Sequence, residues 1–482
     1  MATQTTHLAV IGGGPGGYAA AFLAADLGMD VTLIDQEPNP GGVCLYRGCI
    51  PSKALLHVAG VLNEARQAEA WGVTFGDPAI DLERLRAWKN EVVQRLTGGL
   101  GELAKRRNVT FMQGRASFQD AKTLTVQNMV GEETTLGFDY AIVAAGSRPA
   151  TLPGIYIDSS RVLNSTTALE LRTIPETLLV LGGGYIGLEL GSAYAALGSR
   201  VSVVEMTDGL LPGVDRDLVR FVSKRLEQQF EALMLHTKVV GLEETSDGIR
   251  VSLEGGDGIQ SPQMFDHVLV AIGRQPNGSG LGLKSTRVVI NERGFIEVDA
   301  QRRTAEPTIY AIGDVAGEPM LAHKASHEGR VAVEAIAGHR VAFEPRAIPA
   351  VVFTEPELAW CGLTETQARR EQRKVEVARF PWGASGRAMT LDHVDGLTKL
   401  LIDPETERVL GVGIAGQGAG ELIAEGVLAI EMGAVAADLK LTIHPHPTLS
   451  ETLMEAAEVF FGQSTHLYRP RRPSPSSQRE VA

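Results

Sequence analysis

The sequence predicts an α/β protein with two copies of one βαβ unit and a C-terminal α+β domain. Two apolar segments carry the first part of this prediction: HLAVIGGGPGGYAAAFLAADLGMDVTLID near the N-terminus, and TLLVLGGGYIGLELGSAYAALGSRVSVVE from Thr177 to Glu205. Each segment shows a strand, a glycine turn, a helix and a second strand in the same order. From about Ala347, strand-like runs alternate with long helices, which is typical of an α+β domain.

The first glycine turn has the spacing G-x-G-x-x-G in Gly12, Gly14 and Gly17, directly after a strand and before a helix. Glycines in these places let backbone amides and the helix N-terminus approach a pyrophosphate. Asp35 ends the following strand, where a carboxylate accepts a hydrogen bond from a ribose hydroxyl. A glycine triplet alone also serves ordinary tight turns, but strand, helix and terminal acid together predict a Rossmann-like dinucleotide-binding domain.

The second copy repeats this pattern in Gly182, Gly184 and Gly187, with Glu205 at the end of the next strand. A structural duplicate without a ligand is the alternative, but every required element is intact. Two copies therefore predict two bound dinucleotides. Glu205 would repel a 2′-phosphate and no Arg follows it directly, so NAD is favoured over NADP as the second ligand.

The remaining segments extend these three parts. Residues 53–110 carry helical spacing, and residues 111–145 alternate like strands. The segment IYAIGDVAGEPMLAHKASHEGRVAVEAIAG adds a strand, a GD turn and a helix, which we assign to the first domain after an insertion. The predicted boundaries are 1–150 and 276–346 for the first domain, 151–275 for the second, 347–466 for the α+β domain and 467–482 for a flexible Pro-, Ser- and Arg-rich tail.

Composition and charge exclude several classes of protein. The 482 residues include 45 Lys and Arg against 58 Asp and Glu, a formal net charge of −13 that a nucleic-acid backbone would repel. Three cysteines are too few for a secreted disulfide framework. The N-terminus lacks the basic region of a signal peptide, and no apolar stretch reaches the roughly 18 to 20 residues of a membrane span. We therefore expect no nucleic-acid partner, no membrane span and a cytoplasmic location.

The most informative motif is GGVCLYRGCIPSK, in which Cys44 and Cys49 follow the first acid of the nucleotide-binding unit. Five steps of a regular helix rise about 7.5 Å, whereas the Cα atoms of a disulfide usually lie within about 6.8 Å. A disulfide here therefore requires a distorted turn, which the permissive Gly48 and the amide-free Pro51 would supply. A closed zinc site is a poor alternative, since a second Cys or His pair is missing. Two unconnected buried thiols are also a poor interpretation of this pair, though a reasonable one for Cys361.

The segment HPHPTLSE near the C-terminus offers His446 and Glu451 as a second candidate site. Two prolines keep the histidine segment extended, and a helix follows. A histidine oriented by a carboxylate is typical of a general acid–base catalyst that moves protons between thiols. The alternative is a capping box over residues 448–451, in which Glu451 only starts the helix, and the sequence favours neither.

Together these motifs resemble those of the pyridine nucleotide-disulfide oxidoreductase family, and most closely its dihydrolipoyl dehydrogenases. The resemblance runs from residue 7 to about residue 466, with GGVCLYRGCIPSK, GGGYIGLELG, AIGDVAGEPMLAHKASHEG and HPHPTLSE in the family's order and spacing. It implies a flavoprotein homodimer that oxidises dihydrolipoyl groups and passes electrons through a cysteine disulfide and FAD to NAD. It also implies lipoyl domains of 2-oxoacid dehydrogenase or glycine-cleavage systems as partners.

The resemblance assigns roles to the residues that match its motifs. Cys44 would be the thiol that exchanges with lipoamide, and Cys49 the thiol that faces the flavin. His446 and Glu451 would be the acid–base dyad, reaching the disulfide of the partner subunit. FAD would be bound by Gly12, Gly14, Gly17, Asp35, Gly146 and Asp314, and NAD by Gly182, Gly184, Gly187, Glu205 and Gly273. No residue is expected to bind a metal.

Three further residues would lie near the flavin. Lys53, one helical turn after the cysteines, would pair with Glu189 in the helix of the second unit, although two ordinary surface charges are the plainer alternative from sequence alone. Tyr185 stands where some relatives place an aromatic lid over the nicotinamide pocket, with ordinary packing as the alternative.

The chain departs from the family's usual pattern close to the cysteines. Tyr46 and Arg47 stand where Asn and Val are common. Arg47 would either lower the pKa of a neighbouring thiol or point to solvent. Asp35 replaces a more usual Glu, with a shorter reach to the same ribose.

Two other functions stay open at this point. One is an NAD(P)H-dependent disulfide reductase for another thiol, which Glu205 disfavours when the donor is NADPH. The other is a flavin-bearing redox sensor in which the disulfide switches without turnover.

Overall fold

The computed structural model describes residues 4–256, 258–259 and 261–468, and the chain forms two compact units. The first unit comprises Met1–Asp208 and Phe230–Glu344, and the second Gly209–Gln229 and Pro345–Ala482. A segment from the middle of the second predicted nucleotide-binding domain thus belongs to the C-terminal unit. The predicted tail, from residue 469 onward, lies outside the described residues.

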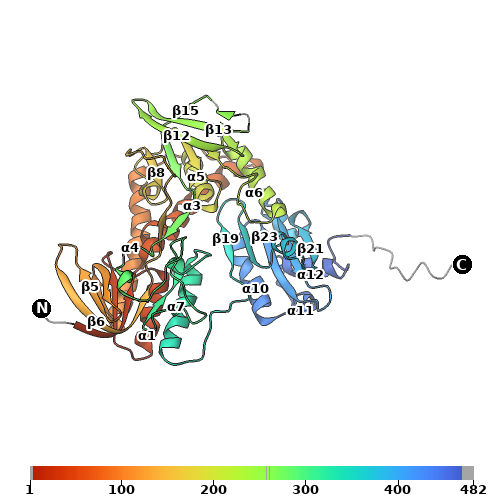
Figure 1. Ribbon diagram of the computed structural model, residues 1–482. Helices are drawn as coiled ribbons and strands as arrows, with labels where there is room; N and C mark the ends of the chain where they lie inside the picture. Colours follow the sequence, from red (N-terminus) through yellow and green to blue (C-terminus); the bar gives the residue numbers. More distant parts are fainter. Residues whose placement is uncertain (1–3, 257, 260, 469–482) are drawn as a thin grey trace. The chain divides into compact units, whose positions relative to one another are not determined.

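A mixed seven-stranded sheet forms the base of the first unit, in the order β3-β2-β1-β6-β5-β4 with β18 paired to β6 (Figure 1). Leu8, Ala9 and Val10 in its central strand are fully buried, as expected for a parallel strand covered on both faces. The strands are β1 (Gln4–Ile11), β2 (Val31–Asp35), β3 (Thr110–Gln113), β4 (Arg115–Asp120), β5 (Thr123–Gln127), β6 (Glu133–Val143) and β18 (Ile309–Ala311). Its helices and 3₁₀ turns are α1 (Pro15–Asp26), α2 (Gly42–Arg47), α3 (Cys49–Gln67), η1 (Ala68–Trp71), α4 (Leu82–Arg106), η4 (Gly313–Val315) and α7 (Ala322–Ile336).

Strand β6, which lies in the segment 111–145 that alternates like strands, pairs with its neighbours in two different ways. Its first half pairs antiparallel with β5, and its second half pairs parallel with β1 and β18. The pairing of β18 with β6 brings the GD turn, which follows β18, to the end of the first sheet. The chain therefore returns to its first sheet after the second nucleotide-binding segment.

The second βαβ unit lies on a five-stranded parallel sheet in the order β11-β10-β9-β16-β8. A small antiparallel sheet, β12 to β15, and the two-stranded pair β7 and β17 complete the first unit. The elements are β8 (Val162–Asn164), η2 (Thr167–Glu170), β9 (Thr177–Leu181), α5 (Tyr185–Leu197), β10 (Arg200–Val204), β11 (Ala232–Met234) and β16 (His267–Val270), then β12 (Lys238–Thr245), β13 (Gly248–Gly255), β14 (Gly258–Ile259), β15 (Gln263–Phe265), β7 (Ser147–Pro149), β17 (Arg274–Pro276) and η3 (Leu283–Ser285).

The second unit is a five-stranded antiparallel sheet, β19-β20-β23-β22-β21, against which α10 and α12 pack. Its core contains the fully buried Trp382, whose indole N–H donates to the hydroxyl of Thr398 at 3.0 Å. The elements are α6 (Arg216–Gln229), β19 (Ala350–Val352), β20 (Leu358–Gly362), α8 (Glu365–Arg370), β21 (Glu376–Pro381), η5 (Trp382–Ala384), α9 (Gly386–Thr390), β22 (Leu397–Ile402), β23 (Val409–Ala415), α10 (Ala419–Met432), α11 (Ala436–Leu441) and α12 (Glu451–Phe460).

The predicted fold class is confirmed: two parallel-sheet βαβ units precede a C-terminal α+β domain. The two compact units do not separate the two nucleotide-binding domains, so the finer boundaries stay a prediction. Among the described residues, no helix is both long enough and apolar enough to cross a bilayer.

Candidate active site

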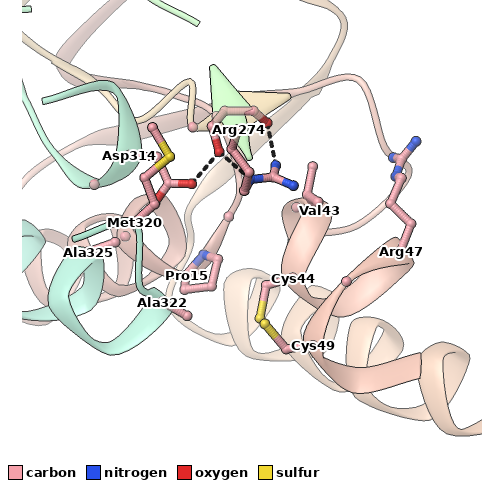
Figure 2. Close-up of a pocket in the computed structure, with 18 of the residues that line it drawn as sticks. Pro15, Val43, Cys44, Arg47, Cys49, Arg274, Asp314, Met320, Ala322 and Ala325 are labelled. Atoms are coloured by element: carbon pink, nitrogen blue, oxygen red, sulfur yellow. Dashed lines mark hydrogen bonds between the residues drawn. The ribbon is translucent and has the colours of Figure 1, made fainter. Parts of the chain in front are cut away.

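One cavity of about 440 Å³ in the first unit gathers most of the residues predicted to surround the flavin. Its volume lies in the range of small-molecule and cofactor sites. The predicted residues that line it are Gly12, Gly14, Asp35, Cys44, Cys49, Lys53, Gly146, Tyr185, Glu189 and Asp314, several of which are drawn in Figure 2. The residues predicted to bind NAD, namely Gly182, Gly184, Gly187, Glu205 and Gly273, lie in the same unit but do not line this cavity.

The first glycine turn has the close backbone approaches that require glycine. Gly12 has a φ of +105°, and a Cβ there would lie 2.3 Å from the carbonyl oxygen of Ala144. A Cβ at Gly17 would lie 1.8 Å from the carbonyl oxygen of Gly12, so any side chain would push α1 off its strand. A Cβ at Gly14 meets only one atom within 4 Å, at 3.9 Å, which leaves space on the cavity side for a pyrophosphate. The turn therefore fits a dinucleotide.

In each βαβ unit, the acid that ends the second strand accepts a backbone hydrogen bond from the glycine turn of the same unit. Asp35 accepts the backbone N–H of Gly13 at 2.5 Å and that of Glu37 at 2.8 Å, one on each carboxylate oxygen. Glu205 accepts the N–H of Gly183 at 2.7 Å in the same way. Burial raises the pKa of Asp35, and the Gly13 hydrogen bond acts against that rise. Each acid thus positions the turn, a role that the sequence does not reveal, and keeps lone pairs for a ribose hydroxyl.

The two cysteines meet at a break between two helices. Helix α2 ends at Arg47 and α3 begins at Cys49, with Gly48 between them at a φ of −144° and a ψ of −116°, which is neither helical nor extended. A Cβ at Gly48 would lie 2.8 Å from the carbonyl oxygen of Val43, so glycine permits the tight turn. Figure 2 shows the sulfurs of Cys44 and Cys49 pointing toward one another. Both cysteines are free in the structure, so the disulfide between them stays a prediction.

The environment separates the pKa values of the two thiols. A hydrogen bond between the sulfurs raises the pKa of Cys44, and burial adds to the rise. The same hydrogen bond, together with the charge of Lys53, lowers the pKa of Cys49 to about 7, although burial opposes the change. Cys49 is therefore the sulfur that ionises first.

Lys53 and Glu189 join the two nucleotide-binding segments beside the thiols. Lys53 Nζ lies 2.7 Å from a carboxylate oxygen of Glu189, whose side chain is only 4% exposed. They are therefore not the two surface charges that the sequence allows as an alternative. Tyr185, the first residue of α5, also lines the cavity and is partly exposed.

Ser147 and Arg274 are cavity residues that sequence reasoning missed. The Ser147 hydroxyl donates to Asp314 Oδ2 at 2.5 Å, and Arg274 Nε donates to the Ser147 hydroxyl at 2.7 Å (Figure 2). Each residue directly follows a predicted glycine, Gly146 or Gly273, with positive φ. The sequence repeats a strand followed by a glycine in YAIVAAGSRPA and FDHVLVAIGRQPN. This repeat is a usable signal, since the residue after the first glycine, Ser147, donates to Asp314, and the residue after the second, Arg274, donates to Ser147.

Buried charged side chains of α7 form hydrogen bonds with the backbone of the turn that carries Asp314. Glu328 is fully buried and accepts the N–H of Gly313 at 2.6 Å and a guanidinium N–H of Arg302 at 2.9 Å. Lys324, one helical turn earlier, donates to the carbonyl oxygen of Gly317 at 2.6 Å. These bonds leave the Asp314 side chain directed at Ser147 in the cavity.

In the second unit, Glu451 makes a contact that belongs to each of the two alternatives that the sequence offers. One carboxylate oxygen lies 2.9 Å from Nδ1 of His446, and the other accepts the N–H of Thr448 at 2.7 Å. The backbone half of the capping interaction is therefore present, while α12 itself begins at Glu451. His446 is 74% exposed, and its Nδ1 is held by Glu451, so Nε2 is the ring nitrogen that Glu451 does not engage.

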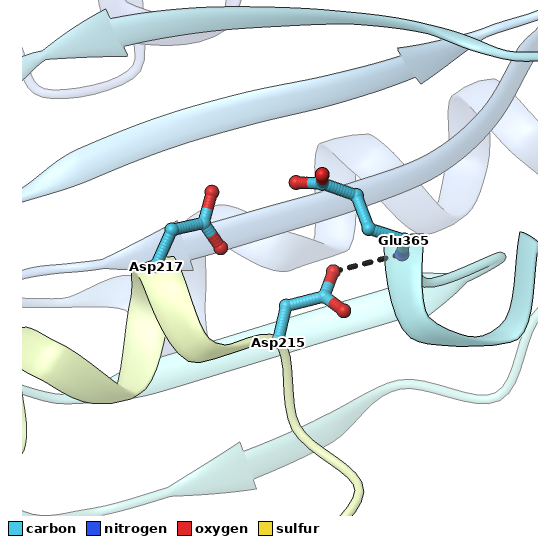
Figure 3. Close-up of side chains that lie close together, drawn as sticks. All are labelled: Asp215, Asp217 and Glu365. Atoms are coloured by element: carbon cyan, nitrogen blue, oxygen red, sulfur yellow. Dashed lines mark hydrogen bonds between the residues drawn. The ribbon is translucent and has the colours of Figure 1, made fainter. Parts of the chain in front are cut away.

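Three carboxylates of the second unit lie close enough together to suggest a metal site. Figure 3 shows Asp215 before α6, Asp217 within it and Glu365 on α8. The ammonium of Lys399 donates to all three, at 2.7, 2.7 and 2.9 Å, and Lys399 is only 1% exposed. The Lys399 ammonium therefore occupies the position that a metal cation would take. Because Lys399 lies on β22 and Asp217 on α6, these ion pairs also connect α6 to the C-terminal sheet.

Comparison with known proteins places these features in one family. The family model described as pyridine nucleotide-disulphide oxidoreductase matches residues 6–329, and its dimerisation domain matches residues 348–457. Dihydrolipoyl dehydrogenase of Vibrio parahaemolyticus is 52% identical over 461 residues, covering 96% of this chain and 97% of the relative. The enzyme of the same name from Haemophilus influenzae is 51% identical over 462 residues, covering 96% of each chain.

Solved structures agree with the sequence relatives. LpdA of Mycobacterium tuberculosis superposes with a TM-score of 0.87 at 28% identity, covering 94% of this chain and 99% of that one. The HOCl-induced flavoprotein disulfide reductase RclA of Escherichia coli, in its Cu(II) complex, has a TM-score of 0.85 at 28% identity, covering 95% of this chain and 99% of that one.

We predict that the reduced protein is alkylated at Cys49 by iodoacetamide with a pH midpoint near 7, below the roughly 8.5 of an ordinary thiol. Only the thiolate reacts, and the lowered pKa lets the Cys49 thiolate form as the pH passes about 7. The alkylation rate should therefore rise between pH 6 and about 8. Lys53→Met removes a neighbouring positive charge and moves the midpoint upward, while Lys105→Met, on the exposed Glu102 pair, leaves it unchanged. Mass spectrometry of the Cys49 peptide measures the rate, and equal midpoints in all three proteins would contradict the assignment.

We also predict that Lys399→Met lowers the free energy of unfolding by about 3–5 kcal/mol, because three carboxylates lose the buried charge between them. Lys224→Met, which removes an exposed pair with Asp395, should cost no more than about 1 kcal/mol. Urea unfolding followed by circular dichroism gives both values. Similar losses of unfolding free energy in the two variants would show that the buried ion pairs of Lys399 stabilise the protein no more than the exposed pair of Lys224 does.

Proposed function

The chain belongs to the pyridine nucleotide-disulphide oxidoreductase family, and from this premise we propose how its residues divide the work of the reaction. The protein is a flavoprotein disulfide oxidoreductase that uses FAD and NAD to oxidise dihydrolipoyl groups to lipoyl groups. The observation that carries the assignment of roles is the pair of facing thiols in a cavity that also contains a dinucleotide-binding glycine turn.

FAD fits the cavity by the features of its lining. The open side of Gly14 and the start of α1 suit the pyrophosphate, and Asp35 suits the adenosine ribose. Asp314, held by Ser147 and by the buried Glu328 behind its turn, is assigned to the ribityl and phosphate region. Bound there, FAD would supply two-electron redox chemistry between the thiol pair and NAD.

The thiol pair accepts electrons from the substrate by disulfide exchange. In the oxidised protein, a dihydrolipoyl thiolate attacks the sulfur of Cys44, forming a mixed disulfide and releasing Cys49 as a thiolate. The second substrate thiol then displaces Cys44, so the substrate leaves as a disulfide and both cysteines are reduced. The low pKa of Cys49 makes it the better leaving group.

His446 is assigned to the proton transfers of the exchange. Its Nε2 would take the proton of the entering thiol, and Glu451 at Nδ1 would orient the ring and stabilise the imidazolium. The C-terminal unit carries the family's dimerisation domain, and the protein is a homodimer. We place the dyad of one subunit at the thiol pair of the partner subunit, which makes the dimer necessary for activity.

The physiological partners belong to the same proposal. The substrate group is carried on lipoyl domains of 2-oxoacid dehydrogenase or glycine-cleavage systems, which fits the name shared by the sequence relatives. A cytoplasmic location follows from the cysteine usage and stays a prediction.

His446→Gln should lower dihydrolipoamide turnover by roughly 10² to 10⁴-fold, because the entering thiol loses its base. Reduction of a quinone by NADH, which does not need thiol exchange, should be largely retained. His444→Gln removes a neighbouring histidine bonded to Glu425 and serves as the matched control. Steady-state rates for both reactions make the comparison, and equal loss of the two activities in His446→Gln would remove the residue from thiol chemistry.

Anaerobic titration of the purified protein tests the whole sequence of transfers. Dihydrolipoamide should produce a thiolate-to-flavin charge-transfer band, and NAD should then remove it and yield NADH. Substitution of NADP should give little reaction, since Glu205 would repel the 2′-phosphate. A preference for NADPH would identify a reductase for another thiol, and reduction by NADH without turnover of any dithiol would identify a redox sensor.

A further inference from the structure

Arg47 lies between the two cysteines in the sequence but is directed elsewhere in the structure. Figure 2 shows its side chain pointing away from the sulfurs of Cys44 and Cys49. Its guanidinium forms an ion pair with Glu37, and both residues line the cavity. The expectation that Arg47 tunes a thiol is therefore not supported by the geometry, and a simple solvent-facing role does not explain the ion pair.

The guanidinium of Arg47 has more donors than the protein uses. A guanidinium carries five N–H donors and stays charged at every relevant pH. Among the described residues, Glu37 is the one ion-pair partner of Arg47, and its Nε is buried without any hydrogen-bond partner. That nitrogen is enclosed by protein, whereas the terminal N–H groups that Glu37 does not use belong to a side chain that is 39% exposed and lines the cavity, so they can reach an acceptor supplied by the ligand.

The neighbouring acids determine which acceptor fits. The backbone N–H of Glu37 donates to Asp35 at 2.8 Å while its side chain pairs with Arg47, so one residue ties the two together. Asp35 only accepts hydrogen bonds and Arg47 only donates them. A hydroxyl satisfies both, because it donates to the carboxylate and accepts from the guanidinium. A phosphate would satisfy Arg47 alone and would be repelled by both carboxylates.

We propose that Arg47, together with Asp35, binds a hydroxyl of the ribose at the adenosine end of FAD. The inference rests on the proposed use of this cavity for FAD and adds a residue that determines how firmly the cofactor is held. It also gives a reason for the short acid at position 35: the long Arg47 side chain supplies a second contact to the same ribose. Arg47 then acts on cofactor affinity and not on the acidity of the thiols.

The test measures FAD affinity directly in the full-length protein. Flavin is removed from the purified holoenzyme, and dissociation constants are obtained from fluorescence quenching for FAD and for its 2′-deoxyadenosine and 3′-deoxyadenosine analogues. Arg47→Met should weaken FAD binding by roughly 10-fold or more, the loss expected for a hydrogen bond to a charged group. The wild-type protein should discriminate against one deoxy analogue, and Arg47→Met should reduce that discrimination at least about threefold.

Two further readouts separate this role from its alternatives. The pH midpoint of Cys49 alkylation should be the same in wild-type and Arg47→Met, and the surface variant Lys105→Met should match wild-type in every measurement. An unchanged dissociation constant for FAD in Arg47→Met, or equal discrimination against the deoxy analogues in both proteins, would overturn the inference. A shift in the pH midpoint of Cys49 alkylation without a change in FAD affinity would show instead that Arg47 acts on the pKa of the thiols.

The failure of this inference is distinguishable from failure of the proposed function. If wild-type protein takes up FAD and oxidises dihydrolipoamide while Arg47→Met binds FAD equally well, only the assignment of Arg47 fails. If wild-type protein takes up no FAD, the use of the cavity itself is wrong.

Discussion

The chemistry of the site depends on a helix that is interrupted at Gly48. In an unbroken helix, side chains five residues apart diverge around the axis, and the two sulfurs would not meet. The break between α2 and α3 turns Cys44 and Cys49 toward one another at the wall of the cavity. Everything assigned to the pair, including the unequal acidity of the two thiols, follows from that local departure from helical geometry.

Local patterns in the sequence were sufficient for the fold class and for the glycine turns. Strand, turn and helix are neighbours along the chain in each βαβ unit, so their periodicity and their glycines are visible without tertiary information. The same holds for the distorted turn, which Gly48 and Pro51 make available. That this turn closes into a disulfide stays a prediction, since both cysteines are free in the structure.

Features that join distant segments were beyond the reach of the sequence. The hydrogen-bonded series from Arg274 through Ser147 to Asp314 spans three segments, and the sequence indicates only Asp314 and the glycines that precede the other two residues. The sequence leaves Glu451 as either a cap or a histidine partner, because residue spacing cannot show that its two carboxylate oxygens contact Thr448 and His446 at the same time. The ammonium of Lys399 among three acids from other elements likewise has no local signature.

The path of residues 209–229 has a consequence for how the protein is divided. The chain leaves the first unit after β10, contributes α6 to the C-terminal unit, and returns for β11. Leu218, Val222 and Leu226 of α6 are buried there. A polypeptide that ends before residue 345 would therefore leave the apolar face of the amphipathic helix α6 without the sheet against which it packs. Neither half of the polypeptide is thus a self-sufficient module that a single cut can release.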